Sequence, residues 1–486
     1  MKLSFLEKII SLFNPKIAMQ RAFLRTQMSG YNSGSYGKRN KNWNKTLLGP
    51  NAAFESQLNL IVARSRDLVR NNPWARSARD KIVSNIVGHG IKGNITGNAK
   101  LEKLWRDWSE TTKCDINNRL DLAGIQELVC NTVVESGECL IKVIYRRSDS
   151  NLEIPIQLQI LECDYIDKTR DNLTANRGRN TIKNGIEYNS LGQAVAYYLY
   201  DEHPGENLGY LNYSVNSKRV KAENIIHIFN PERSGQNRGI PWFAPVANKI
   251  KDLNEYEDTQ LIRQKISACF AGFIYDNDPA SALNGYEKNE DYELSDKVTP
   301  GLFEILPPNK DIKFSSPPAI TGYQEYNSAI LHSIAAGLNI TYEMLTGDFS
   351  QVNYSSARMG KLEMKKKITR WQKNLFTANT LPRIFKWFLE AVELQNINVK
   401  KYQIKWTVPK FELVDPQKEI AAIKDEIRLG LNSPSSAIIE MGRDPEEVYS
   451  EWKKDKELFE SLNLIFDCDP SKISLAGQVN QHNQNI

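Results

Sequence analysis

The sequence predicts an α+β fold that is mainly helical and multidomain, with an antiparallel sheet confined to one domain. Three observations support this prediction. Residues 51–238 combine helical apolar periodicity with short alternating runs that are bounded by turn residues. Residues 239–273 keep the apolar spacing of a single long helix. Near the C-terminus, three helix starts are each marked by a capping residue followed by proline.

The composition is that of a water-soluble protein. Hydrophobic residues make up 41% and charged residues 25% of the 486 residues, which supplies enough apolar material for sizeable cores. No uncharged apolar run is long enough to span a membrane. The net charge of +5 is too small to indicate a nucleic-acid partner by itself. Glu7 and Lys8 interrupt the amphipathic N-terminus, which therefore predicts a surface or partner-docking helix and not a signal peptide.

The cysteines and histidines predict neither a metal site nor a cofactor. The six cysteines contain no C-x-x-C pair, and most fall in apolar segments, as buried thiols do in a reducing compartment. The five histidines are dispersed. Residues 88–93 match the pattern G-x-G-x-x-G, but a predicted helix precedes them. A dinucleotide site needs a strand before the glycines and a helix after them.

Residues 1–50 are predicted to form a flexible arm, because Arg, Lys, Asn, Ser and Gly dominate residues 20–50. The charge of this arm could contact nucleic acid or a neighbouring subunit, or it could remain solvated.

The α+β domain begins with helices and continues as a sheet. A first helix is expected from Asn51 to about Arg70. Asn72 and Pro73 then cap and start a second helix, which ends at Val87 before a left-handed Gly88 cap. The further expected segments are helices 101–111 and 121–136, strands 138–145, 156–161, 184–188, 194–200 and 225–229, and turns at Asn184-Gly185 and Leu191-Gly192.

The stretch 239–273 predicts one helix of about 30 residues, about 45 Å long at 1.5 Å per residue. Pro241 and Pro245 fit its first turn, and no glycine follows until Gly272. Its apolar seam is narrow, and the acidic residues between the apolar positions include Asp252, Glu255 and Asp258. Few single domains need such a helix, whereas a wall or strut in an assembly does.

Residues 274–320 are acidic and rich in turn residues, which predicts a small insertion with short strands near 303–306 and 312–314. The chain becomes helical again over 323–338. Residues 346–353 have the composition of a loop, and a second long helix is expected from Tyr354 to about Gln395, with a kink or break at Pro382.

One face of this second long helix is basic. Within an arc of about 140°, at about 100° per residue, it carries Arg358, Lys361, Lys365, Lys366 and Lys373. Such a run is either a solvated face or a surface for a negatively charged partner.

The C-terminal region predicts one strand over 403–408 and three short helices. The helices start at Asp415-Pro416, Ser433-Pro434 and Asp444-Pro445, and the first two end at Gly430 and Gly442. Residues 466–486 are predicted to be a polar tail.

Three pairs of stretches occur in a recognisable order. They are residues 64–75 with 85–88, residues 238–245 with 252–258, and residues 345–349 with 353–358. On these stretches the chain resembles the portal proteins of tailed bacteriophages, in the lambda-like portal family. The similarity spans about residues 45–460.

The resemblance implies a homo-oligomeric, dodecameric ring at one capsid vertex. A terminase would package double-stranded DNA through this ring, with non-specific contacts, and tail or adaptor proteins would dock later. Capsid and scaffold proteins would be further partners, in the host cytoplasm during assembly and then in the virion. No cofactor, metal or membrane contact is expected.

The resemblance also implies a domain organisation. The domains would be an arm 1–50, a wing 51–238, a first stem helix 239–273, a clip 274–320, a second stem helix 321–340, a tunnel loop and long kinked wing helix 341–414, a helical crown 415–465 and a tail 466–486.

The resemblance also suggests which residues face DNA. A channel should hold a duplex without gripping it, because each neutralised phosphate strengthens salt-dependent binding. The candidates in the tunnel loop and its flank are Asp348, Phe349, Gln351, Asn353, Arg358, Lys361 and Lys365. Asp252, Glu255 and Asp258 are candidates for an acidic channel lining, or for salt bridges between subunits.

Two alternatives compete with this hypothesis. A metal-dependent nucleic-acid-processing enzyme could use Glu255, Glu257 and Asp258. These residues lie on one helix, however, where Glu255 and Glu257 point apart, and no carboxylate-bearing strand is evident. The motifs of a Walker ATPase, a G-x-S-x-G hydrolase and an H-E-x-x-H protease are missing from the sequence, so no catalytic residue is predicted. The other alternative is a different ring-forming virion connector or a scaffold-binding capsid component.

Overall fold

The computed structural model describes residues 10, 12–17, 19, 47–146, 152–171, 180–206, 216–268, 272–276, 310–314, 322–397, 401–409, 416–462 and 464. The chain separates into two compact units, Met1–Ser56 and Gln57–Ile486. In the first unit, the Asn14 side chain accepts a hydrogen bond from the Ile17 amide beside a short helical segment. Most of the predicted arm lies outside the described residues. All elements named below belong to the second unit.

Helices from the first part of the second unit pack into its core. The helices α3 (Leu58–Asn71), α4 (Pro73–Val87) and α6 (Leu122–Ser136) pack against one another, and α5 (Ala99–Ser109) packs on β1 (Lys92–Thr96). α3 begins later than predicted, because residues 50–57 form turns. The Asn72 side chain accepts a hydrogen bond from the Ala75 amide, which confirms the predicted cap. Gly88 has φ +50° and ψ −121°, so its positive φ is confirmed but its conformation is not the predicted left-handed cap.

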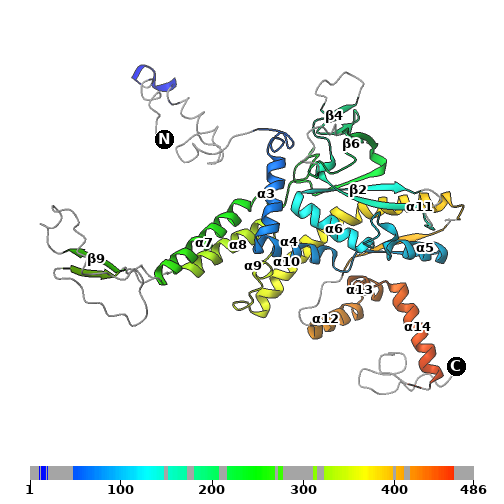
Figure 1. Cartoon of the computed structure of the whole chain (residues 1–486). Helices are drawn as coiled ribbons and strands as arrows, with labels where there is room; N and C mark the ends of the chain where they lie inside the picture. The colour runs from blue at the N-terminus through cyan, green and yellow to red at the C-terminus, as the bar shows by residue number, and fades with distance from the viewer. Residues whose placement is uncertain are drawn as a thin grey trace, which may run out of the picture. The chain divides into compact units, whose positions relative to one another are not determined.

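Two antiparallel sheets occupy the domain predicted to be α+β (Figure 1). In the first sheet β2 (Glu138–Tyr145) lies between β3 (Ile156–Glu162) and β8 (Ile225–Phe229), and α6 packs against β2. The second sheet has the order β4 (Thr181–Lys183), β5 (Ile186–Tyr188), β6 (Ala194–Leu199) and β7 (Lys218–Lys221). The predicted antiparallel sheet and the bounds of β2 and β8 are confirmed, and β3 and β6 differ from their predictions by one residue. Short 3₁₀ turns cover Thr112–Cys114, Cys163–Tyr165 and Ala222–Asn224.

Some sheet predictions were wrong or incomplete. The turn predicted at Asn184-Gly185 is confirmed, since both residues have positive φ between β4 and β5, but the strand predicted from 184 therefore starts only at Ile186. The strands β1, β4 and β7 were not predicted. β1 pairs with β11 (Gln403–Thr407), which ends one residue before its prediction. The glycine motif at residues 88–93 runs from a helix into β1, which is not the order that a dinucleotide site requires.

The buried cysteines behave as predicted. Among the described residues, Cys114, Cys130, Cys139 and Cys163 are buried and unpaired. Burial raises the pKa of the Cys163 thiol to about 12, so this thiol is not reactive near neutral pH. The other two cysteines of the sequence lie outside the described residues.

The helix predicted over residues 239–273 is shorter than expected. It is α7 (Ala247–Ala268), and residues 242–246 form turns. Phe243 is fully buried and the Trp242 amide donates to the Val134 carbonyl at 3.1 Å, so packing against the body prevents helical geometry there. Phe273, the predicted last residue, lies in β9 (Gly272–Asp276). β9 pairs with β10 (Lys310–Phe314), which contains the predicted strand 312–314. The predicted strand 303–306 lies outside the described residues.

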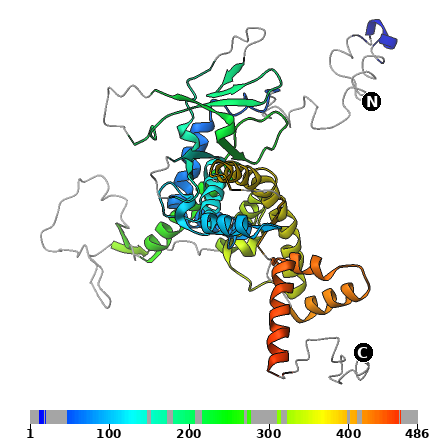
Figure 2. The same cartoon turned by 90° about the vertical axis from the view of Figure 1, so that its right-hand side faces the viewer.

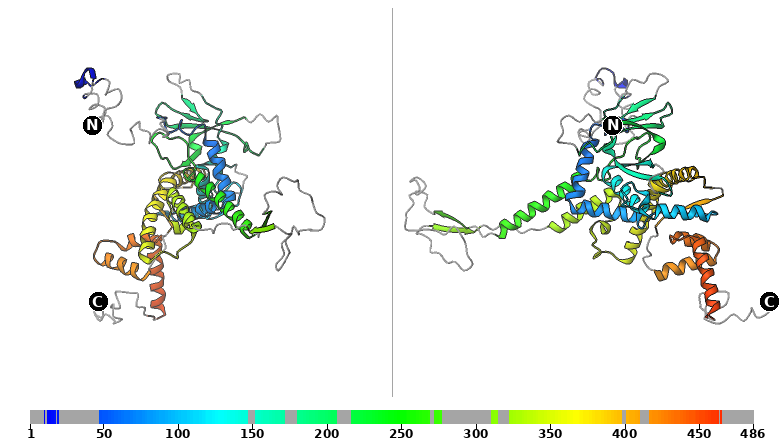
Figure 3. Two further views of the ribbon diagram at one scale, coloured as in Figure 1. Left: turned by 90° about the vertical axis from the view of Figure 1, so that its left-hand side faces the viewer. Right: turned by 45° about the vertical axis from the view of Figure 1, so that its right-hand side comes forward.

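α7 runs antiparallel to α8 (Tyr323–Leu338), and the two helices lie side by side (Figures 1 and 3). The rings of Tyr256 and Tyr326 lie 4.5 Å apart. At the other end, a Cβ added to Gly337 would lie 2.3 Å from Val246, so the helices approach closely there. The bounds predicted for α8 are confirmed. Ile250 and Leu253 of the apolar seam of α7 are buried, whereas Leu261 and Ile262 are 50% and 56% exposed. The outer half of the seam is therefore uncovered in one copy of the chain.

The second predicted long helix is divided. α9 (Tyr342–Thr346) and the loop 347–353 lead into α10 (Tyr354–Gln372), which ends in a π-helical turn, Lys373–Thr377. α11 (Thr380–Leu394) follows. The predicted break is confirmed, but it begins before Pro382, which sits in the first turn of α11, where proline is tolerated.

The three C-terminal helices are α12 (Pro416–Arg428), α13 (Pro434–Glu440) and α14 (Pro445–Ser461) (Figure 2). Ser433 and Asp444 each accept a backbone amide hydrogen bond at a helix start, as predicted. Asp415 lies outside the described residues. Within the described part of the chain, none of the helices combines the length and apolar character that a membrane span requires.

Candidate functional site

The loop between α9 and α10, residues 347–353, is exposed and is held by local hydrogen bonds. Thr346 Oγ1 accepts from the Asp348 amide at 3.1 Å, and Asp348 Oδ1 accepts from the Ser350 amide at 2.9 Å. The Ser350 hydrogen bonds hold the pKa of Asp348 below its usual range, so this carboxylate is charged near neutral pH. The Phe349 side chain is 63% exposed, and Gln351 is exposed as well. The predicted loop residues therefore present one acidic, one aromatic and one amide side chain to solvent.

Asn353 has a structural role that the sequence prediction missed. Its side chain accepts a hydrogen bond from the Ser356 amide at 2.9 Å, and it thereby caps the N-terminus of α10. A polar residue before a predicted helix is the signal that could have revealed this role. The cap fixes the point at which the loop ends and the basic helix begins.

The basic face predicted on α10 points away from the core. Met364, Ile368 and Trp371 are buried on the adjacent face of the helix. Arg358 and Lys365 are exposed, and Lys361 is half-buried. The structure thus brings these three cations onto the segment that directly follows the exposed loop.

The acidic candidates lie on a different element, α7. Asp252, Glu255 and Asp258 are exposed, and Glu255 pairs with Lys251 at 3.2 Å one turn away. Glu257 is partly buried, which raises its pKa, and its side chain hydrogen-bonds to Trp74. Glu257 is therefore engaged with the body rather than converging on a shared ion with Glu255 and Asp258. This arrangement does not favour the two-metal alternative.

The chain leaves the body and enters α7 beside a buried ion pair that sequence reasoning did not identify. Glu138 at the start of β2 and Arg238 in the loop before α7 have side chains that are 1% and 2% exposed. Arg238 Nε donates to the two Glu138 oxygens at 2.8 and 3.0 Å, and Arg238 Nη2 also donates to Glu138. The Gly239 amide donates to Glu138 at 2.7 Å, and His227 Nε2 lies 3.0 Å from it.

The charge state of this pair follows from its partners. Burial alone would raise the pKa of Glu138, but the Arg238 guanidinium and His227 hold it well below its usual range. The pair is therefore ionised at neutral pH, with four donors around one carboxylate.

Two glycines allow the backbones to approach at this position. A Cβ added to Gly239 would lie 2.1 Å from the Gly137 carbonyl oxygen, and one added to Gly137 would lie 2.5 Å from Ile240. Only residues without a side chain fit, because the loop crosses directly over the end of α6. The ion pair and the glycines together fix the path of the chain into α7.

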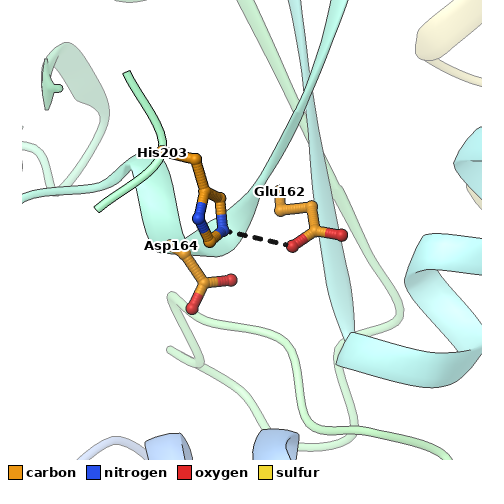
Figure 4. A group of neighbouring side chains, drawn as sticks. All are labelled: Glu162, Asp164 and His203. Carbon is orange, nitrogen blue, oxygen red and sulfur yellow. Dashed lines mark ion pairs between the residues drawn. The ribbon is translucent and has the colours of Figure 1, made fainter. Parts of the chain in front are cut away.

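A second cluster contains potential metal ligands (Figure 4). Ligand atoms of Glu162, Asp164 and His203 all lie within 4.8 Å of one another. Arg66 Nη2, however, lies 2.8 Å from Glu162 Oε2 and 2.6 Å from Asp164 Oδ2. His203 Nε2 lies 3.5 Å from Glu162 Oε2. Burial alone would raise the pKa of Asp164, but the hydrogen bond from Arg66 lowers it. The guanidinium therefore already pairs with both carboxylates, and the geometry is that of a partly exposed ion-pair network.

The candidate residues are thus surface side chains of the loop 347–353 and of the helices α10 and α7. The chain enters α7 beside the buried ion pair of Glu138 and Arg238. Side chains placed in this way are suited to contacts that are spread over extended surfaces. The model of the family described as phage portal protein, lambda family, matches residues 36–372, and the chain belongs to this family. Its function is that of a portal, the head–tail connector of a virion.

Relatives of known identity agree with this family. The chain is 24% identical to the probable portal protein of Halomonas phage phiHAP-1, in an alignment that covers 82% of this chain and 80% of that protein. It is 23% identical to the portal protein of Escherichia phage N15 and 23% identical to portal protein B of Escherichia phage lambda, each over 87% of this chain and 89% of the relative. Among solved structures, a chain from the neck of a native gene transfer agent particle is similar with a TM-score of 0.47 and 14% identity, covering 78% of this chain and 94% of that one.

Proposed function

We propose that copies of this chain form a closed ring, a dodecamer as is typical of the family, and that double-stranded DNA passes through its channel. A terminase would drive DNA inward during packaging, and the DNA would leave by the same channel at ejection. Capsid and scaffold proteins would surround the ring during assembly in the host cytoplasm, and tail or adaptor proteins would dock on it in the virion. The observation that carries this proposal is the exposed loop 347–353, followed directly by a basic helix face.

The loop and its flank are proposed to be the elements nearest to DNA. Phe349 and Gln351 would touch the duplex without sequence preference, and Arg358, Lys361 and Lys365 would approach its phosphates. B-DNA carries one negative charge per about 1.7 Å of axis, so a ring of lysines at one height exerts a strong attraction. The charged Asp348 carboxylate, one per copy, opposes this attraction and would keep the duplex mobile.

The exposed acidic face of α7 is proposed to line part of the channel. Asp252 and Asp258 would repel phosphates, so the duplex would not be held tightly there. Glu255 contributes less, because Lys251 already neutralises it within the helix. The alternative role of these carboxylates, pairing with a neighbouring copy, would place them in an interface instead.

Charge reversal on the basic flank tests this assignment. The variant with Lys361→Glu and Lys365→Glu should retain less DNA in particles, because phosphate attraction becomes repulsion. DNA content per particle is the measurement. The matched control reverses two exposed lysines of α5, Lys100→Glu with Lys103→Glu, and should leave DNA content unchanged.

Ring formation is measured separately, by native mass and negative-stain electron microscopy of the purified chain. If the flank variant forms rings and its particles contain the normal amount of DNA, the assignment of the basic face is overturned and the proposed ring is not. A chain that stays monomeric even with its scaffold protein present would overturn the ring itself.

A further inference from the structure

The strand β1 has an outer edge that no described strand covers. On its inner side β1 pairs with β11, and these two strands form a sheet of their own. In an antiparallel pair, every second residue directs its amide and carbonyl away from the partner strand. Among the described residues, none outside β11 forms a hydrogen bond with the main chain of β1. The outer edge of β1 can therefore pair with a further extended segment.

This outer edge lines an open cleft of about 870 Å³. Every residue from 89 to 99 contributes to the lining, whereas no residue of β11 does, so the cleft lies on the side of β1 that faces away from β11. At Gly90, Gly93 and Gly97 the lining atoms belong to the main chain, because glycine has no side chain. The glycine pattern at residues 88–93 thus keeps part of this wall free of side chains. The other walls are α5, the start of α6 and α14.

Carboxylates outnumber cations in this cleft. The charged side chains of its lining are Glu102, Glu110, Asp121, Asp444, Glu446, Glu447 and Glu451, together with Lys92, Arg106 and Lys454. Lys92 and Arg106 are already used, because each pairs with one of the two glutamates of the α5 wall. Glu451 pairs with Arg443 outside the lining, and Arg443 also interacts with Glu447.

The remaining carboxylates give the cleft its net negative charge. Asp121, Asp444 and Glu446 form no ion pair with a described residue, and Lys454 is the cation of the lining that is left to oppose them. Asp121 and Asp444 accept cap hydrogen bonds from main-chain amides, but these bonds do not cancel their charge. The cleft therefore suits an extended segment that carries positive charge.

The sequence of this chain contains a segment with the complementary charge. Residues 20–46, which lie outside the described residues, include six cations and neither aspartate nor glutamate. From residue 39 to residue 45, a basic or aromatic residue alternates with asparagine, in the order Arg39, Asn40, Lys41, Asn42, Trp43, Asn44 and Lys45. In an extended segment, this alternation would place the three cations on one face. The main chain of the segment could then pair with β1 while its cations meet one wall of the cleft.

The arrangement of the second unit favours the segment of a neighbouring copy. The arm joins this unit at Gln57, directly before α3. The Ser65 hydroxyl of α3 donates to the Glu135 carbonyl at the end of α6, whereas the cleft is lined by the start of α6. α3 and the cleft therefore lie at opposite ends of α6, which is placed between α3 and α5 in Figure 1. In a head-to-tail ring, one flank of a copy faces the opposite flank of the next, so an arm can reach the neighbouring cleft without crossing its own body.

We propose that residues 39–45 of one copy pair with the outer edge of β1 in the next copy and bring their cations beside the carboxylates at the start of α14. This proposal rests on the proposed ring. The Asn94 side chain already donates to Asp444 at 2.8 Å, so the start of α14 is held next to β1. The charge of the arm would then join neighbouring copies instead of contacting DNA.

Hydrogen exchange on the full-length chain, as purified monomer and as ring, tests the strand pairing. The β1 amides that β11 does not bind, called the outer amides, should exchange quickly in the monomer and at least about tenfold more slowly in the ring. The β1 amides that bind β11 should be protected in both states and are the internal reference. Outer amides that stay fast in the ring would overturn this proposal and leave the ring standing. Failure of the unmodified chain to form any ring would overturn the proposed ring and this proposal with it.

Charge reversal tests which segment covers β1. In rings of the arm variant Lys41→Glu with Lys45→Glu, the outer amides should lose their protection, because like charges would meet in the cleft. Arg21→Glu with Arg25→Glu is the matched control, since it changes the charge of the same arm equally but outside residues 39–45. This control should behave like the unmodified chain. Protection that survives in the arm variant would mean that another segment or protein covers β1, which overturns the proposal.

A charge exchange provides the second readout. The cleft variant Glu446→Lys with Glu447→Lys should also lose the protection of the outer amides in the ring. Exchange of the α14 amides in the monomer checks that this helix stays folded. Combining the cleft variant with Lys41→Glu and Lys45→Glu should restore the protection, because opposite charges face each other again. A combined variant that is no better protected than either parent would contradict contact between the arm and the cleft.

Isotope mixing tests which copy supplies the segment. Rings are assembled from nitrogen-15-labelled and unlabelled chains, each with a photo-reactive residue in place of Asn42, and the crosslinked peptides are identified by mass spectrometry. Links from residue 42 to β1 or α14 of a chain with the other isotope are expected. Links that always join peptides of the same isotope would place the arm in the cleft of its own copy, and links to neither element would leave the cleft without the arm. Either result would overturn the proposal.

Discussion

Two clusters in the α+β domain use the same kinds of side chain at very different depths. In the first cluster, Glu138, Arg238 and His227 are sealed between β2, β8 and the loop that leads to α7. In the second cluster, Arg66 pairs with Glu162 and Asp164 beside His203, where α3 meets the end of β3. The Glu138 side chain is 1% exposed, whereas the Glu162 side chain is 47% exposed.

The difference in burial gives the two ion-pair clusters different structural roles. In the sealed cluster, removing one partner would leave a charge that water cannot reach, so both residues are needed to define the path into α7. In the surface cluster, water and salt can replace either partner at small cost. The same chemistry therefore fixes the position of α7 in one place and only helps to hold α3 against the sheet in the other.

The stretches by which the chain resembles its family are rich in such contacts. In the stretch 238–245, Arg238 forms the buried ion pair and the Trp242 ring packs 4.6 Å from the ring of Trp371. In the stretch 345–349, Leu345 is buried and its carbonyl accepts from the Ser77 hydroxyl at 3.3 Å. These stretches therefore contain buried contacts that join elements of the fold, beside exposed residues such as Asp348 and Phe349.

The largest expected effect comes from breaking the sealed pair. Arg238→Met should lower the free energy of unfolding by about 3–5 kcal/mol, because Glu138 would keep its charge in a buried position without its main partner. Urea denaturation of the monomer is the measurement.

The double variant Glu138→Met with Arg238→Met is the control. It should recover most of the loss, because removing both charges leaves an apolar contact of similar volume. If the single variant loses less than about 1 kcal/mol of unfolding free energy, the ion pair does not fix the path of the chain into α7.

The second largest expected effect is the loss of stability of the sealed cluster in acid. The pKa of Glu138 is lowered by folding, so its contribution to stability is complete above the ordinary glutamate value of 4.5 and falls as the pH drops below it. The free energy of unfolding should therefore decrease below about pH 4.5. The double methionine variant should show a shallower decrease, although Asp164 still contributes in the same direction. Parallel pH profiles for the two proteins would contradict this assignment.

Local signals in the sequence predicted much of the fold. The caps at Asn72, Ser433 and Asp444 and the bounds of β2 and β8 depend on adjacent residues, and these predictions were confirmed. The helix start at Pro241 was wrong because burial of the neighbouring aromatic residues outweighs the local helical pattern.

Long-range features could not be predicted in this way. The sealed pair joins residues that are 100 positions apart in the sequence, and Ile95 of β1 pairs with Ile404 of β11. No local pattern identifies such partners. For the candidate loop, composition predicted the exposure of Phe349 and Gln351, whereas the cap made by Asn353 was missed. The contact of these residues with DNA stays a prediction, because it depends on neighbouring copies of the chain.

The smallest expected effect is the dependence of the surface cluster on salt, which compares the two clusters directly. Arg66→Met should cost about 1 kcal/mol of unfolding free energy at low ionic strength, since its carboxylate partners are partly solvated. At about 1 M salt, where the screening length is about 3 Å, this cost should shrink. The cost of Arg238→Met should stay nearly constant over the same range, because ions do not enter the sealed cluster. Denaturation of both variants at the two salt concentrations measures the difference. A cost of Arg66→Met that does not change with salt would mean that the surface cluster is as well shielded as the sealed one, and that exposure does not distinguish the two.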